Sequence, residues 1–135
     1  MKKTAVSLLS ALVLMFAANT LLFAQSGEET AAKAAEQAGK LSEALTQYMT
    51  ALQKTADGSA DEQRIREMII GLAQRMSPPL PIPAEARRFW VHGNVWIKEA
   101  KGPSDFGEAA KEYAKTLRIA PWWGDAYYNR GVVLE

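Results

Sequence analysis

The sequence predicts an all-α protein in which antiparallel helical hairpins stack as a short α-solenoid. The first observation is a spacing that occurs twice, 65 residues apart: an alanine, a tyrosine four residues later and a small residue three residues after that. Small residues on both sides of one ring let two helices cross closely while the ring fills the remaining gap. The second observation is that apolar residues recur at helical spacing in segments separated by glycine and proline. The two sets are Ala44, Tyr48 and Ala51, and Ala109, Tyr113 and Thr116.

Residues 1–24 have the pattern of a secretory signal peptide, because a basic start is followed by an uncharged, largely apolar stretch over residues 5–18. We expect cleavage after Ala24. If the segment were retained, residues 5–24 could just span a bilayer, so a membrane anchor stays open as the alternative. The expected location is the periplasm or cell envelope of a bacterium, or the exterior after secretion.

The composition excludes several classes of protein. Of the 16 Lys and Arg residues, Lys2 and Lys3 lie in the segment expected to be removed, so 14 remain against 15 Asp and Glu. A nearly neutral protein lacks the basic stripe that neutralises phosphates, so we expect no nucleic-acid partner. The chain has no cysteine, so no disulfide stabilises it and no lipid can be attached at the cleavage point.

The first hairpin is expected within residues 25–58. Ser26 and Glu29 have the spacing of a capping box that starts a helix through an alanine-rich stretch, and Gly39 offers the turn to the next helix. The apolar face of that second helix consists of Leu41, Ala44, Leu45, Tyr48, Met49 and Leu52.

Residues 59–83 are expected to hold an inserted helix and a proline-rich connector. Ser59 and Glu62 form a second capping box, and four prolines between positions 78 and 83 favour an extended strut. The apolar stripe of the inserted helix consists of Ile65, Met68, Ile69, Leu72 and Met76.

The second hairpin is expected within residues 84–121. Its first helix, from Ala84 to about Lys98, is the most aromatic part of the chain, so we expect it to be buried on more than one side. Its second helix should run from about Asp105 to Ile119. The residues expected to face inward there are Phe106, Ala109, Ala110, Tyr113 and Leu117.

These residues resemble the tetratricopeptide repeat (TPR) family, whose hairpin unit of about 34 residues carries Trp, Leu-Gly, Tyr, Ala, Phe, Ala and Pro in a fixed order. The resemblance implies a TPR-like fold that binds a protein or peptide segment. Residues 122–135, with a helix from about Asp125, would then be the first helix of an incomplete third repeat. The matching positions are Gly39, Leu41, Ala44, Tyr48 and Ala51, then Phe106, Ala109, Tyr113, Leu117 and Pro121, then Tyr127 and Gly131.

Five residues are candidates for partner binding. Trp122 and Trp123 are adjacent in a turn, so both indoles cannot point into one small core, and we expect at least one to be an exposed contact residue. Tyr128 belongs to the same group of aromatic residues, which consists of Phe89, Trp90, Trp96, Trp122, Trp123, Tyr127 and Tyr128. The resemblance implies that Asn94 and Asn129 could hydrogen-bond a peptide backbone, and ordinary helix-surface hydrogen bonding is the alternative.

No residues have the spacing of a catalytic or ligand-binding motif. The sequence offers no nucleophile with its base, no phosphate-binding loop and no set of metal ligands, so we expect neither an enzyme nor a cofactor or metal site. His92 is the only histidine, and a solvated or hydrogen-bonded role fits it better than metal binding. The basic residues Arg87, Arg88, Lys98 and Lys101 either receive an acidic partner segment or form a solvated mixed face.

The sequence therefore predicts an exported, non-catalytic, TPR-like protein-interaction module that acts as an adaptor or scaffold. Two alternatives stay open. The protein could be a structural homo-oligomer that completes its last repeat by self-association. The chain could also be a truncated part of a longer TPR protein.

Overall fold

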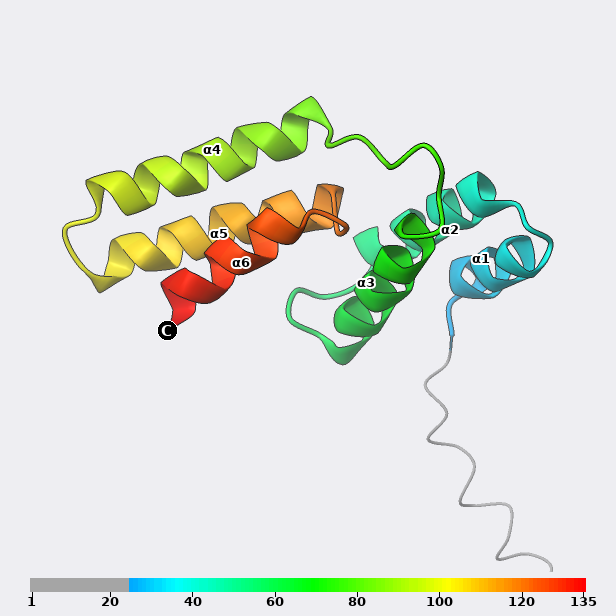
Figure 1. Cartoon of the computed structure of the whole chain (residues 1–135). Coiled ribbons are helices and arrows are strands. Elements are labelled where there is room, and N and C mark those ends of the chain that lie inside the picture. Colours follow the sequence, from blue (N-terminus) through cyan, green and yellow to red (C-terminus); the bar gives the residue numbers. More distant parts are fainter. Residues whose placement is uncertain (1–24) are drawn as a thin grey trace, which may run out of the picture.

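The computed structural model describes residues 25–135, and the predicted signal peptide lies outside them. This part of the chain is helical without strands, which confirms the predicted all-α class (Figure 1). Local signals set the helix boundaries to within a few residues of the predicted ones. The helices are α1 (Gly27–Gln37), α2 (Leu41–Gln53), α3 (Ala60–Ala73), α4 (Ala84–Glu99), α5 (Pro103–Ile119) and α6 (Gly124–Leu134).

The helices form two groups of three. In the first unit α1 packs on α2 and α2 packs on α3, and in the second unit α4 packs on α5 and α5 packs on α6. The connector from α3 to α4 crosses between the units in extended form (Figure 1). The inserted helix, α3, is therefore the third member of the first unit.

The serine of each predicted capping box caps its helix. The Ser26 hydroxyl accepts a hydrogen bond from the backbone N–H of Glu29 at 3.2 Å, and the Ser59 hydroxyl accepts one from the backbone N–H of Glu62 at 3.1 Å. Each bond satisfies an N–H group that has no partner within its helix. Gly39 turns the chain between α1 and α2 with φ of +74°, a conformation that side chains with a Cβ adopt rarely.

The core of the first unit lies between α1, α2 and α3. Small alanines let the helices approach, and the Tyr48 ring fills the space between them with only 1% of its surface exposed. The carboxylate of Glu29, also 1% exposed, is neutralised by Arg64 from α3. The buried apolar residues are Ala32, Ala35, Ala44, Tyr48, Ala51, Leu52, Ile65, Ile69 and Leu72.

The second unit repeats this packing with different residues. Tyr113 of α5 is fully buried and its ring lies directly on Gly93 of α4, where a Cβ atom would come within 2.6 Å of the ring. Thr116, at the position of Ala51 in the first unit, places its hydroxyl 3.1 Å from the Glu112 carbonyl oxygen. That bond satisfies the polar group inside the core.

Two predictions about burial are wrong. Helix α4 buries only Ala86 and Gly93, while Val91, Val95 and Trp96 are 49%, 45% and 41% exposed, so it packs on one side only. Its neighbour α5 covers one face of α4, and no other helix covers the opposite face within residues 25–135.

The second wrong prediction concerns Phe106, which is 39% exposed although we expected it to face inward. It lies in the first turn of α5, close to the α4–α5 loop, where the two helices begin their contact. Among the described helices, none besides α4 lies at this end of α5 for the ring to pack against, since α6 lies along the rest of α5 (Figure 1).

No helix within residues 25–135 combines the length and the apolar composition that crossing a bilayer requires.

Candidate interaction site

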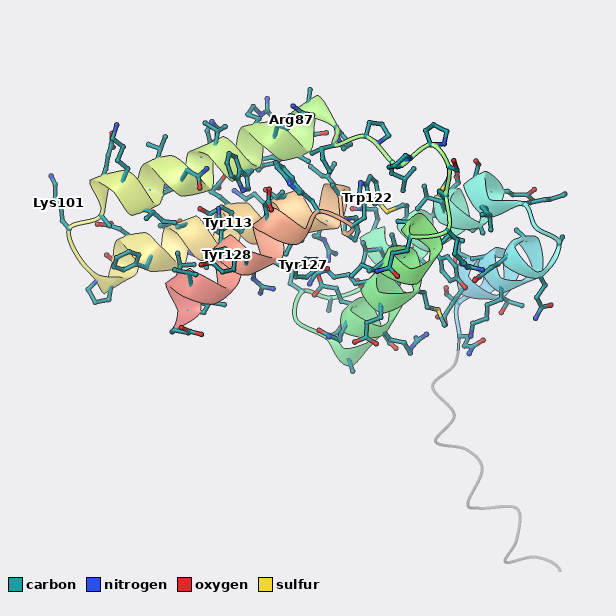
Figure 2. All side chains as sticks on the ribbon, in the orientation of Figure 1. Arg87, Lys101, Tyr113, Trp122, Tyr127 and Tyr128 are labelled. Carbon is teal, nitrogen blue, oxygen red and sulfur yellow. The ribbon has the colours of Figure 1, made fainter. Side chains whose placement is uncertain are left out.

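The two adjacent indoles of the α5–α6 turn point in different directions. Trp122 packs against the core of the first unit, and Trp123 stacks at a tilt on Trp90 of α4 with ring centroids 5.4 Å apart. Both indoles are half-buried. Trp122 lies between the two units in Figure 2. The two neighbouring rings therefore pack against different parts of the protein, and neither ring is fully exposed.

The two candidate asparagines bond to each other. The Asn94 amide oxygen accepts a hydrogen bond from the Tyr113 hydroxyl at 2.7 Å and another from the Asn129 side-chain amide at 3.2 Å. Burial raises the pKa of the Tyr113 phenol, which keeps it protonated and able to donate. This network joins α4, α5 and α6 and occupies the Asn94 oxygen that would bind a peptide backbone.

Tyr128 is the most exposed of the five candidates. It is 73% exposed on α6, and Val132, four residues later on the same helix face, is 55% exposed. Leu134 adds a further apolar side chain that is 63% exposed. Tyr128 and Val132 therefore form an exposed apolar patch on one side of α6, which we call the α6 apolar face, whereas Leu134 lies about 120° around the helix from Tyr128.

The basic residues near α4 do not form one cluster. Arg87 lies at one end of α4 and Lys101 lies beyond the other end, so the length of the helix separates them (Figure 2). His92 lies between them on the surface, with Nδ1 3.6 Å from a Glu112 carboxylate oxygen. The basic side chains near α4 are therefore spread over a solvated surface and do not form one binding patch.

Arg118 connects the two units. From the end of α5 its guanidinium donates to a Glu62 carboxylate oxygen at 2.9 Å and to the Thr55 carbonyl oxygen at 2.8 Å. It also forms an ion pair with Asp57, with 3.0 Å between the guanidinium nitrogen and the carboxylate oxygen. Glu62 is 4% exposed and also accepts hydrogen bonds from Arg66 at 2.5 Å and from the Gly58 backbone at 2.6 Å. One buried carboxylate thus holds a guanidinium from each unit.

A pocket of about 510 Å³ opens beside this junction. Its walls come from the α2–α3 loop, α3, α5 and α6, and its charged lining holds five cationic side chains and two carboxylates. We call it the basic pocket. Its lining residues are Asp57, Gly58, Glu62, Arg66, Ala110, Lys111, Ala114, Lys115, Arg118 and Arg130.

Sequence reasoning missed the basic pocket. Its residues are spread from position 57 to position 130, and no local spacing brings them together. The one available signal was the Glu62 and Arg66 pair, four residues apart on a helix, which is also the ordinary spacing of a surface ion pair.

Residues 25–135 contain no group of three or more His, Cys, Asp or Glu side chains placed to hold a metal ion. No family model, curated protein or solved structure matches the chain.

Proposed function

We propose that the chain is an exported, TPR-like protein-interaction module that binds a segment of another protein in the bacterial periplasm or cell envelope. The observation that carries this proposal is the α6 apolar face, because exposed apolar side chains gathered on one helix gain free energy when a partner covers them. Tyr128 is the central contact, since a tyrosine offers both a large apolar ring and a hydroxyl for hydrogen bonding.

The proposed TPR-like solenoid is supported by a feature that both units share, a buried tyrosine packed among small residues. Tyr48 and Tyr113, 65 residues apart, are 1% and 0% exposed, and each sits among small residues of its own unit. Chains of this kind bind partners along a surface formed by successive helices. The sequence pattern of residues 1–24 supports export.

Site-specific photo-crosslinking tests the proposal. Tyr128 is replaced by a photo-reactive phenylalanine analogue, the protein is illuminated in an envelope extract, and the adducts are identified by mass spectrometry. The matched control carries the same analogue in place of Thr46, an exposed residue of α2 in the other unit. We expect one dominant adduct with a second protein from position 128 and none from position 46.

Two outcomes would contradict the proposal. Adducts of equal strength from both positions would mean that α6 is not a preferred surface. An adduct of the chain with itself alone would favour a self-associating structural protein. The mass of the protein isolated from the envelope tests the export step separately, because cleavage after Ala24 leaves a chain that begins at Gln25.

A further inference from the structure

Hydrogen-bond donors without acceptors gather where α3 faces α6. The Nε atoms of Arg66 and Arg130 and the hydroxyl of Tyr127 are buried and have no hydrogen-bond partner within the described part of the chain. Figure 2 shows Tyr127 directed from α6 toward α3. The charges of Arg66 and Arg130 are close enough to this phenol to act on its pKa, which burial raises. Donors buried in this way cost free energy unless an acceptor reaches them.

Two of these three residues, Arg66 and Arg130, line the basic pocket. The Arg66 side chain is only 8% exposed and engages a single carboxylate, that of Glu62. Arg130 makes no ion pair with any residue of the described range, although it lies beside a pocket that carries two acidic groups. The carboxylate of Glu62 is already shared by two guanidiniums and one backbone N–H group. The site therefore has cationic donors in excess of acceptors.

We infer that the basic pocket binds a small organic anion whose oxygen atoms accept hydrogen bonds from Arg66 and Arg130. An arginine guanidinium matches the paired oxygen atoms of a carboxylate or a phosphate ester, and such bonds strengthen when both partners are charged. Lys111 and Lys115 on α5 also line the pocket, although each is paired with a carboxylate three residues earlier on the helix, Glu108 and Glu112. The guanidinium of Arg130 pairs with no acidic side chain of the described residues, so it can meet such an anion at the pocket wall.

The shape of the pocket favours an anion with a carbon skeleton. Its volume of about 510 Å³ far exceeds that of a bare inorganic ion and lies within the usual range of small-molecule sites. Ala110, Ala114 and Gly58 give part of the wall no polar side chain, so an apolar portion of the ligand can lie there. Because the walls belong to both units, a bound anion would also hold the two units together.

The experiment measures binding of defined anions to the purified protein by calorimetry and by thermal unfolding. Citrate and glycerol 3-phosphate are the organic probes, and inorganic phosphate and chloride at equal ionic strength are the reference anions. We expect at least one organic probe to bind and to raise the melting temperature, and Arg130→Gln to weaken that binding about tenfold. The matched control is Arg87→Gln, which removes the same charge from an exposed site on α4, away from the pocket (Figure 2).

The Arg130 side chain makes no hydrogen bond within residues 25–135, so its replacement leaves no partner unpaired. Lys111→Gln, at another residue that lines the pocket, is a second variant that should also weaken binding. The inference fails if neither organic probe binds. It also fails if the reference anions bind equally well, or if Arg87→Gln weakens binding as much as Arg130→Gln. These results are independent of the photo-crosslinking at position 128, so the pocket and the proposed interaction module can fail separately.

Discussion

Gly93 determines how closely α4 and α5 approach. A Cβ atom at this position would lie 2.6 Å from Cε1 of Tyr113, closer than packed atoms allow, and the ring is fully buried and cannot move away freely. Gly93→Ala should therefore lower the free energy of unfolding by about 1–3 kcal/mol. Urea unfolding followed by far-UV circular dichroism measures this change.

The matched control is Gly107→Ala, because Gly107 lies within α5 and has open space where the Cβ atom would be placed. Alanine loses less backbone entropy than glycine when a helix forms, so this variant should be more stable by about 0.5–1 kcal/mol. Equal stability of the two variants would mean that the close approach at Gly93 does not constrain the hairpin.

Tyr48 should make stability depend on alkaline pH. Burial, together with the hydrogen bond that its hydroxyl donates to Glu36 at 3.0 Å, raises the pKa of the phenol to about 12. The unfolded chain releases this proton near pH 10, so the folded state binds more protons between the two pKa values and loses stability as the pH rises. The contribution is fully present below about pH 10.

Tyr48→Phe removes the titrating group and isolates this effect. The difference in unfolding free energy between the wild-type protein and the variant should shrink as the pH is raised from about 10 toward 12. Denaturant unfolding at a series of pH values measures it. A difference that stays constant over this interval would contradict the raised pKa.

Helices α1 and α3 each begin where a serine side chain caps them, and α3 gives the clearest case. The Ser59 hydroxyl caps the helix through the Glu62 backbone N–H, and Ser59→Ala should cost about 1 kcal/mol of unfolding free energy. Ser104→Ala is the control, since Ser104 lies in the first turn of α5 without capping it. Thermal unfolding compares the two variants, and equal losses would contradict the capping role.

Helix positions could be predicted from the sequence because capping boxes, glycine turns and apolar periodicity act over a few residues, as at Ser26 and Gly39. Burial of α4 could not be predicted from its aromatic content, because the side that is covered depends on which helices pack around it. The basic pocket depends on four separate segments, so no local pattern marks it. The sequence therefore predicted where the helices lie along the chain, but not how helices far apart in the sequence pack against one another.

At the scale of the whole molecule, the two units are joined by few contacts. Trp122 packs on the first core, the Gln53 side chain donates to the Arg118 carbonyl oxygen at 3.1 Å, and the Arg118 guanidinium bonds to Glu62 and Thr55. The Arg118 side chain is 21% exposed and the Glu62 side chain 5% exposed, so this ion pair contributes more than one at the surface. Arg118 is therefore the polar contact on which the docking of the units depends most.

Arg118→Met should uncouple the units, because methionine keeps an apolar stem but donates no hydrogen bond to Glu62 or Thr55. All four tryptophans lie in the second unit, so their fluorescence follows that unit and, through Trp122, its contact with the first core, while far-UV circular dichroism follows both units. In the wild-type protein we expect the two signals to change at the same urea concentration, as they do when a protein unfolds in one cooperative step. In the variant the fluorescence transition and the dichroism transition should separate.

Lys115→Met is the control, because Lys115 lies on the same helix and is 52% exposed, with a single ion pair to Glu112. Coincident transitions in Arg118→Met would show that the apolar contact of Trp122 alone couples the two units.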